Sequence, residues 1–582
     1  MTGRHVVVVG HGMVGARLAE EISRHDPAGH RVRLTILAAE PCPAYNRVLL
    51  PSLLSGALRE EDLTGGRPRP GSAAGNRIAG TDKISGRNGP VTPPVPAIAL
   101  RTGTTVNGLD PVRQTVGSGG GDVIGYDDLV LATGARAVVP PLPGLLGGDG
   151  NRGLPGEAPA RSDTRTAAAF SPALAADVAV LRSLADARRI AGFAQAARRT
   201  GRRIVMLGGG VLGLEAARAL AARGTEVTVV HRGTHPMERQ LDGPAGRVLA
   251  AAMRRTGVAM ELGVGAASWE SGRGLWLADG RLVPAAALVL CTGAAPETAL
   301  ARAAGLRLTE SGAVSVDDTL ATSIPGIYAI GDCAGHPGAA GGLVQPGWEQ
   351  AAVLASRLTG ASVRARYRGS GTVTRLKAAG IELTCLGAPL GEPGDAGDVG
   401  DAGTPGDLGE ERREVLRFED PARERYAKLV LARDRVVGAI LIGLPDAAAG
   451  IIALYDRDAR VPADRLAVLL GRALPPAGDD GASRPSALPD YAVVCRCNMV
   501  TKGQIRDAWY GGACSRAALS SATRAATGCG SCRDELDAFA AWLGQTDPGQ
   551  LRPDTSAEPA SESASESTLQ SGDEPVREES LR

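Results

Sequence analysis

The sequence has no excess of charge of either sign and no long hydrophobic run. Its 582 residues include 64 lysines and arginines against 63 aspartates and glutamates, so the formal net charge is +1 at pH 7. This balance gives no electrostatic reason to expect binding to nucleic acid or to an anionic membrane surface. No apolar run reaches the roughly 18 residues that a membrane-spanning helix needs. We therefore expect small molecules and other proteins as partners, with no nucleic acid and no membrane.

The N-terminus lacks the pattern of a secretory leader. "MTGRHVVVVGHG" passes directly into a short apolar strand and then into glycines, without a basic stretch followed by an apolar core and a cleavage site. We therefore expect a cytoplasmic protein. Structural disulfides are disfavoured in that reducing compartment, so clustered cysteines are interpreted first as metal ligands or redox groups.

Five segments have too few apolar residues to offset the entropy cost of ordering them. They are rich in Gly, Pro, Ser and charge, and span about 65–96, 145–165, 390–412, 474–489 and everything after about 546. We interpret the first three as surface insertions, the fourth as a linker and the last as a disordered acidic tail. Between them, short β-branched runs alternate with Ala/Leu/Arg-rich stretches, which is typical of parallel α/β domains.

A glycine loop follows the apolar strand at the start of the chain. Gly10, Gly12 and Gly15 have the spacing G-x-G-x-x-G. In this pattern the first glycine makes a tight turn, the second lets the backbone approach a pyrophosphate, and the third lets the following helix pack closely. The next predicted strand ends at Glu40, whose carboxylate can accept a hydrogen bond from an adenosine ribose. The pattern predicts a dinucleotide site.

The same pattern of strand, glycine loop and helix recurs about two hundred residues later. Gly208, Gly210 and Gly213 repeat the spacing, and the following predicted strand ends at His231 and Arg232, without a carboxylate. A basic residue at this point can accommodate a 2′-phosphate, whereas an acid favours the free ribose hydroxyl. The second site is therefore expected to favour NADPH. The alternative is that Arg232 is only a solvated residue at the end of a strand.

Four cysteines near the C-terminus form two close pairs. Cys495 and Cys497 are separated by one residue, 31 residues follow, and Cys529 and Cys532 are separated by two. Four thiolates are the usual ligands of a [2Fe-2S] cluster, and they also suit tetrahedral zinc. The residues alone leave both metals open, with a disulfide-bonded, metal-free arrangement as a minor alternative.

Two ordered glycine fingerprints resemble those of the flavoproteins with two dinucleotide-binding domains, in which the first site holds FAD and the second NAD(P)H. Three further motifs agree with this resemblance. They are "YDDLVLATGARAVVPPLPG" at 126–144, which contains Thr133 and Gly134, "LVLCTGAAPE" at 288–297, and "GIYAIGDCAG" at 326–335, which contains Gly331 and Asp332. The resemblance implies that Asp332 binds the ribityl chain of the flavin. It also implies that Glu215 lies near the nicotinamide, with a solvated helix glutamate as the alternative.

A narrower resemblance rests on "AAEPCPAYNRVLLPSLLSG" at 38–56. It is similar to the flavin-binding start of the large subunit of assimilatory nitrite reductase and of the electron-transfer subunit of assimilatory nitrate reductase. "MERQLD" at 237–242, "TRLKAAGIEL" at 374–383 and "YAKLVLARDRVVGAILIG" at 426–443 continue it. The resemblance covers most of residues 1–545 apart from the insertions. It implies that Arg47 contacts the flavin, with a surface cation as the alternative.

The cysteine pairs resemble the bacterioferritin-associated-ferredoxin-like module, a small helical domain that holds a [2Fe-2S] cluster. This context favours the cluster over zinc, because a reduced flavin needs a one-electron outlet and zinc has no redox chemistry. No cysteine follows Cys532, so the chain lacks the later cysteines of a nitrite reductase sirohaem domain. We therefore expect the electron-collecting half of such a system. Its partner would be the catalytic subunit of assimilatory nitrate reductase or a separate nitrite reductase.

The expected fold is α/β, with FAD and NAD(P) Rossmann-like domains followed by two smaller domains. The FAD domain comprises 1–145 and 298–360, and the NAD(P) domain 166–297. An α+β domain at 361–473, a helical [2Fe-2S] module at 490–545 and the tail at 546–582 complete the chain. Ligands are expected at the carboxyl ends of the parallel strands.

Two other functions and several properties stay open. One alternative is a thiol-based disulfide or peroxide reductase, although the sequence has no C-x4-C pair and Cys42 lies between prolines. Another is a redox-sensing or iron-release docking protein, for which complete flavin and nicotinamide motifs would be superfluous. No catalytic residue is assigned, and a homodimer is one alternative for the oligomeric state.

Overall fold

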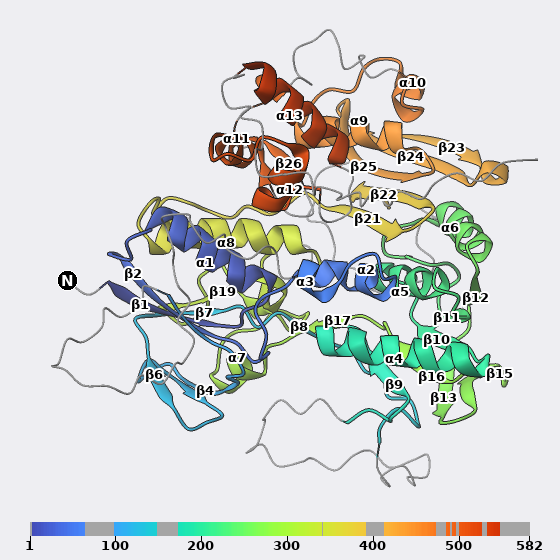
Figure 1. Ribbon diagram of the computed structural model, residues 1–582, viewed down its shortest axis with the longest axis horizontal. Helices are drawn as coiled ribbons and strands as arrows, with labels where there is room; N and C mark the ends of the chain where they lie inside the picture. Colours follow the sequence, from blue (N-terminus) through green and yellow to red (C-terminus); the bar gives the residue numbers. More distant parts are fainter. Residues whose placement is uncertain are drawn as a thin grey trace, which may run out of the picture.

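The computed structural model describes residues 3–63, 98–147, 173–339, 341–390, 413–472, 485–488, 490, 492–495, 500–526 and 532–546. The expected insertions, linker and tail lie largely outside these residues. Two α/β bodies stand side by side, and the C-terminal elements lie above them in the view of Figure 1. No helix in the described ranges has the length and apolar character required to cross a bilayer.

The first body is built on a five-stranded parallel sheet in the order β19-β7-β1-β2-β3. Val6, Val7 and Val8 of β1 have no exposed surface, as expected for a central parallel strand covered on both faces. Helices α1 and α8 lie above the sheet and the β4-β5-β6 meander lies below it (Figure 1). The strands are β1 (Arg4–Val9), β2 (Val32–Leu37), β3 (Ile98–Arg101), β7 (Asp128–Leu131), β19 (Ile327–Ala329), β4 (Val106–Asp110), β5 (Thr115–Ser118) and β6 (Val123–Gly125).

Several shorter elements complete this body. Because β19 lies late in the sequence but joins the first sheet, the chain returns to this body after building the second. The sequence placed the end of the second strand at Glu40, whereas β2 ends at Leu37 and Glu40 lies in the following loop. The helices and short strands are α1 (Met13–His25), η1 (Arg47–Leu49), α2 (Leu50–Leu54), α3 (Glu60–Leu63), α7 (Ala299–Ala303), β18 (Val314–Ser315), η2 (Gly331–Cys333), β20 (Ala334–Gly335) and α8 (Val344–Leu358).

The second body has a parallel sheet in the order β12-β11-β10-β16-β9 and a separate three-stranded sheet, β13-β14-β15. Its helix α4 begins with a capping box, in which Ser183 and Asp186 satisfy each other's backbone N–H groups. Short strands β8 (Ala135–Ala137) and β17 (Ala294–Pro296) pair where the chain passes between the bodies. The other elements are β9 (Val178–Val180), α4 (Leu184–Thr200), β10 (Ile204–Leu207), α5 (Val211–Ala221), β11 (Val227–His231), α6 (Gly243–Arg255), β12 (Val258–Leu262), β13 (Ala266–Glu270), β14 (Gly274–Leu277), β15 (Leu282–Pro284) and β16 (Ala287–Leu290).

An antiparallel sheet with the order β21-β22-β25-β24-β23 follows. Buried residues of this sheet, including Leu376, Ile381 and Tyr426, belong to the same hydrophobic core as helices α5 and α6. At this junction Tyr426 donates a 2.6 Å hydrogen bond to Asp242, and the Lys428 ammonium lies 3.6 Å from the same carboxylate. The elements are β21 (Val373–Ala378), β22 (Ile381–Gly387), β23 (Glu414–Asp420), η3 (Pro421–Arg423), β24 (Arg425–Ala432), β25 (Arg435–Ile442), α9 (Pro445–Asp456) and α10 (Arg465–Leu469).

The last elements form a small helical module with its own core. Cys495, Trp509, Leu519, Cys532 and Phe539 are among the residues buried together there. The module lies above α1 and α8 and beside the antiparallel sheet (Figure 1). Its elements are η4 (Pro485–Ala487), β26 (Val493–Cys495), β27 (Val500–Thr501), α11 (Lys502–Tyr510), α12 (Arg516–Thr523) and α13 (Arg533–Thr546).

Candidate functional site

The first glycine loop leaves open space at the start of α1. Gly10 has φ +110°, and a Cβ added there would lie 2.3 Å from the Ala132 carbonyl oxygen. A Cβ on Gly15 would lie 2.2 Å from the Gly10 oxygen, whereas one on Gly12 meets nothing within 4 Å. Gly12 is the N-cap of α1 and provides no side-chain hydrogen bond. The first turn of the helix therefore offers backbone N–H donors beside an open space, which suits a phosphate group.

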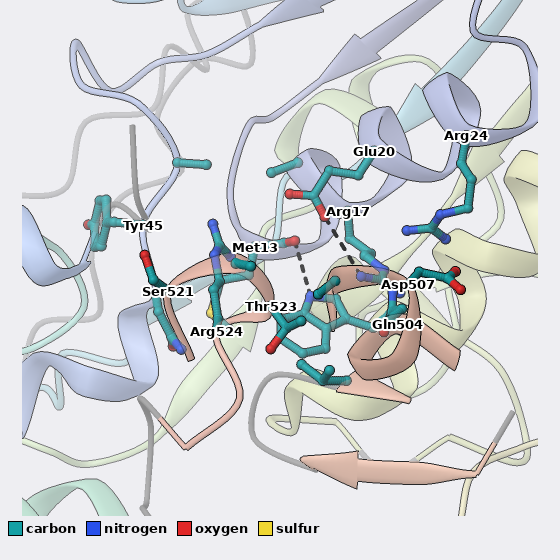
Figure 2. Close-up of a pocket in the computed structure, with 17 residues that line it drawn as sticks. Met13, Arg17, Glu20, Arg24, Tyr45, Gln504, Asp507, Ser521, Thr523 and Arg524 are labelled. Atoms are coloured by element: carbon teal, nitrogen blue, oxygen red, sulfur yellow. Dashed lines mark hydrogen bonds and ion pairs between the residues drawn. The ribbon is translucent and has the colours of Figure 1, made fainter. Parts of the chain in front are cut away.

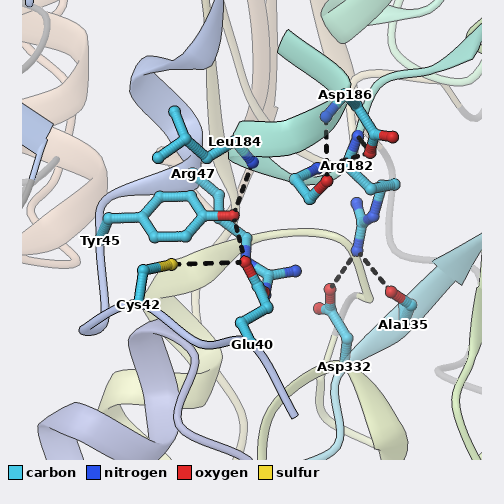
Figure 3. A network of polar contacts seen from close by, with 10 residues as sticks. Glu40, Cys42, Tyr45, Arg47, Ala135, Arg182, Leu184, Asp186 and Asp332 are labelled. Atoms are coloured by element: carbon cyan, nitrogen blue, oxygen red, sulfur yellow. Dashed lines mark hydrogen bonds and ion pairs between the residues drawn. The ribbon is translucent and has the colours of Figure 1, made fainter. Parts of the chain in front are cut away.

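Glu40 and Arg47, both predicted site residues, meet beyond the carboxyl end of β2 (Figure 3). Tyr45 donates a 2.8 Å hydrogen bond to the Glu40 carboxylate. The Tyr45 hydroxyl also accepts a 2.9 Å bond from the backbone N–H of Leu184, the first residue of α4. Burial raises the pKa of Tyr45 to about 12, so the hydroxyl keeps its proton at neutral pH. The cluster thus fastens the loop after β2 to the second body.

Asp332 lies in η2 and faces Arg182 (Figure 3). The guanidinium of Arg182 is 3.6 Å from the Asp332 carboxylate and donates a 3.2 Å bond to the Ala135 oxygen. Gly331 donates to the Gln350 side chain at 2.7 Å. Sequence reasoning missed Arg182, because its pairing with Asp332 joins segments 150 residues apart and no local motif marks it.

The turn at Thr133 and Gly134 contacts the corresponding turn of the second body. Thr133 donates a 2.6 Å bond to the Glu297 oxygen, and the Glu297 N–H donates a 2.9 Å bond to the Gly134 oxygen. These predicted residues therefore lie where the two bodies meet, beside the β8-β17 pair.

The second glycine loop repeats the construction of the first. Gly208 has φ +119°, and a Cβ added there would lie 2.3 Å from the Cys291 oxygen. A Cβ on Gly213 would lie 2.3 Å from the Gly208 oxygen, and one on Gly210 meets nothing within 4 Å. Arg232 is exposed immediately after the end of β11. The structure therefore provides a second open space at a helix start, with a cation at the neighbouring strand end.

Glu215 is buried, so the alternative of a solvated helix glutamate is wrong. The residue is 5% exposed, and its carboxylate accepts a 2.7 Å bond from the backbone N–H of Lys377 in β21. Burial raises the pKa of this carboxyl group. Sequence spacing could not reveal this, because the antiparallel sheet that covers Glu215 comes from a distant segment.

Two of the four paired cysteines lie among the described residues. Cys495 and Cys532 are 0% and 4% exposed in one core, and the Ala526 N–H points at the Cys532 sulfur at 3.2 Å. Cys497 and Cys529 lie outside the described residues. Amide N–H groups directed at sulfur are among the features that tune iron–sulfur centres.

A cleft of about 450 Å³ separates the module from the first body (Figure 2). One wall comprises the start and outer face of α1, Trp348 of α8 and the loop containing Tyr45. The opposite wall is α11 together with the end of α12, including Asp507 and Arg524. Trp348 donates a 3.1 Å bond to the Met13 oxygen at the first turn of α1. The cysteine-bearing module is therefore placed beside α1, which follows the first glycine loop, and beside the loop after β2.

Cys42 does not have the environment of a reactive thiol. Its sulfur lies 4.0 Å from the Glu40 carboxylate (Figure 3). Burial, followed by the nearby Glu40 charge, raises the pKa of the Cys42 thiol. A nucleophilic cysteine needs the opposite shift, so this geometry disfavours a thiol-based reductase.

Two family descriptions match the chain. Pyridine nucleotide-disulphide oxidoreductase matches residues 4–355, and BFD-like [2Fe-2S] binding domain matches residues 493–541. The second match includes all four paired cysteines.

Among curated relatives, the NAD(P)H nitrite reductase of Bacillus subtilis is 30% identical over 92% of this chain and 57% of its own length. The assimilatory nitrate reductase electron transfer subunit of the same organism is 27% identical over 92% of this chain and 59% of its own length. The chain thus spans a little over half the length of these two relatives. Among solved structures, a NAD-dependent persulfide reductase from A. fulgidus has a TM-score of 0.57 and 24% identity, covering 78% of this chain and 76% of that one. This likeness shows the two-domain fold.

Proposed function

Because the chain belongs to the pyridine nucleotide-disulphide oxidoreductase family and carries a BFD-like [2Fe-2S] binding domain, we propose that it is an NAD(P)H-dependent flavoprotein that passes electrons to a partner reductase. The observation that carries the proposal is the position of the cysteine module across the cleft from α1, whose first residue Met13 follows the first glycine loop, and from the loop of Tyr45. A thiol reductase needs no such module, and a docking protein needs neither dinucleotide site.

We propose that FAD is held by the first body. Gly10, Gly12 and Gly15 would admit its pyrophosphate, which the open space at Gly12 accommodates. Glu40 would bind the adenosine ribose and Asp332 the ribityl chain, with Arg47, Thr133, Gly134 and Gly331 around them. Bound flavin supplies the chemistry that accepts an electron pair and releases electrons singly. Arg182 is added to this set because it fixes the Asp332 carboxylate.

The second body is proposed to bind NAD(P)H through Gly208, Gly210 and Gly213, with Glu215 near the nicotinamide ring. Arg232, exposed after β11, supports a preference for NADPH, since a guanidinium suits a 2′-phosphate.

The proposed domain limits are 1–145 with 298–360 for the FAD domain and 166–297 for the NAD(P) domain. The α+β domain is proposed to span 361–473 and the [2Fe-2S] module 490–545, followed by the tail.

The module is proposed to hold a [2Fe-2S] cluster on Cys495, Cys497, Cys529 and Cys532. The burial of two of these thiols in one core, with an N–H directed at one sulfur, fits a ligated cluster. The accepting partner would be an assimilatory nitrate reductase catalytic subunit or a nitrite reductase, as the names of the relatives suggest. The homodimer is proposed as one alternative for the oligomeric state, and light scattering tests it by measuring the molar mass in solution.

The decisive experiment compares Cys495→Ser with Cys514→Ser, which removes another cysteine of the same module. Anaerobically purified wild-type protein should contain flavin, iron and acid-labile sulfide. Cys495→Ser should lose the iron and the cluster absorbance but keep the flavin and its reduction by NADPH, whereas Cys514→Ser should keep both centres. Zinc in place of iron, or flavin with no metal, would overturn the proposal.

A further inference from the structure

A carboxylate lies close to the end of β11, although the residue that carries it does not directly follow the strand in the sequence. After Arg232 the chain turns back toward the second glycine loop, and the Met237 N–H donates a 3.0 Å bond to the Gly209 oxygen. Met237 adopts φ +56°, a left-handed backbone conformation that is uncommon for residues other than glycine. The segment from Arg232 to Met237 is therefore hydrogen-bonded to the glycine loop that is proposed to bind the nicotinamide nucleotide.

This turn places the Glu238 side chain beside Gly233. A Cβ added to Gly233 would lie 2.1 to 2.2 Å from the Glu238 carboxylate atoms, so the carboxylate occupies the space beside Gly233. Its Oε2 atom is 3.8 Å from Nε2 of His231, the last residue of β11. The Glu238 side chain is 25% exposed, so a ligand at this strand end can reach it.

The neighbouring histidine does not neutralise this carboxylate at neutral pH. Burial lowers the pKa of His231, with the Glu238 charge acting in the opposite direction as a smaller effect. The His231 ring packs on the glycine loop, because a Cβ on Gly209 would lie 2.8 Å from it. Among the described residues, no lysine or arginine forms an ion pair with Glu238. A carboxylate therefore lies near the end of β11, and the exposed Arg232 directly follows that strand.

We propose that Glu238 supplies the ribose-binding carboxylate that β11 itself lacks and thereby limits the preference for NADPH that Arg232 creates. A carboxylate at this place in a Rossmann domain accepts from the free 2′-hydroxyl of NADH. The same charge repels a 2′-phosphate. Two residues of opposite charge at one strand end therefore set the choice of nucleotide. The inference rests on the proposed binding of NAD(P)H by the second body.

The test replaces Glu238 by Gln, which keeps the shape of the side chain and removes its charge. Glu226→Gln is the matched control, because Glu226 precedes β11 at the opposite end of the strand and is exposed beside Arg203. Binding of NADP⁺ and NAD⁺ to the oxidised holoprotein is measured by calorimetry, and kcat/KM is measured with both reduced nucleotides.

Glu238→Gln should tighten NADP⁺ and weaken NAD⁺, changing the ratio of the two dissociation constants by about tenfold, which corresponds to about 1.4 kcal/mol. Arg232→Ala should move the ratio in the opposite direction, and Glu226→Gln should leave it unchanged. Glu238→Ala, with its fold checked by thermal unfolding, should act like Glu238→Gln.

An unchanged ratio in both Glu238 variants, or an equal change in Glu226→Gln, would overturn the inference. Failure of the proposed function would look different, since wild-type protein would then bind neither nucleotide and reduce no flavin.

Discussion

At the residue scale, the two glycine loops separate glycines required by the backbone from glycines that leave room for a ligand. Gly10 and Gly208 have positive φ and lie against a neighbouring carbonyl, where no L side chain fits. Gly12 and Gly210 have negative φ and open space around them. The same substitution should therefore have different effects within one loop.

We predict that Gly208→Ala lowers the stability of the second body by about 1–3 kcal/mol, the usual cost of a strained backbone position. Gly210→Ala should leave the unfolding midpoint nearly unchanged, because the added methyl meets no protein atom. It should instead weaken NADP⁺ binding, since the methyl fills the space proposed for the pyrophosphate. Thermal unfolding and calorimetry distinguish the two effects, and equal loss of stability in both variants would contradict the assignment.

At the scale of elements, helix α6 is joined to the antiparallel sheet through one buried carboxylate. Asp242 caps α6 by accepting from the Ala245 N–H at 3.1 Å, and it also accepts from Tyr426. The Lys428 ammonium, fully buried, is 3.6 Å away. Both partners lie on β24, so this carboxylate connects the second body to the sheet.

We predict that Asp242→Asn destabilises this junction by about 3–5 kcal/mol, because it removes the anion facing a buried ammonium. Tyr426→Phe should cost less, about 1–3 kcal/mol, since it removes a hydroxyl donor and leaves the charge pair in place. Urea unfolding measures both. Glu424→Gln, which breaks the exposed Arg255–Glu424 pair at the same junction, serves as the control and should change little. A larger effect of the control would contradict the assignment of the junction to Asp242.

At the scale of the whole molecule, the two C-terminal units are attached in different ways. The antiparallel sheet shares a continuous core with the second body. The cysteine module has a separate core, and its described ion pairs, Arg506–Asp490 and Arg516–Asp537 among them, are internal to the module. The cleft lies between the module and the first body. The fold of the first and second bodies should therefore not depend on the module.

A chain truncated after Arg472 should accordingly keep its flavin and the NADPH-driven reduction of that flavin. It should lack the absorbance of the cluster and transfer electrons poorly to one-electron acceptors. Flavin content, stopped-flow absorbance and the unfolding midpoint test this, with the full-length protein as the reference. Loss of flavin on truncation would show that the module stabilises the first body.

The sequence by itself determined the parallel α/β fold, the two dinucleotide loops and the cysteine module. These features are encoded locally: glycine spacing, apolar strands and cysteine spacing each depend on residues that are close together in the chain. The chain spans a little over half the length of the two Bacillus subtilis relatives.

Only the tertiary structure decided which distant groups meet. Arg182 reaches Asp332, Glu215 is covered by the strand of Lys377, and Glu238 returns to the end of β11. Each of these contacts depends on how the chain turns and packs between elements, and burial then sets the charge state of the groups involved. Sequence spacing does not report that packing. It therefore identified Arg232 at the end of β11 but not the carboxylate of Glu238 near the same strand end.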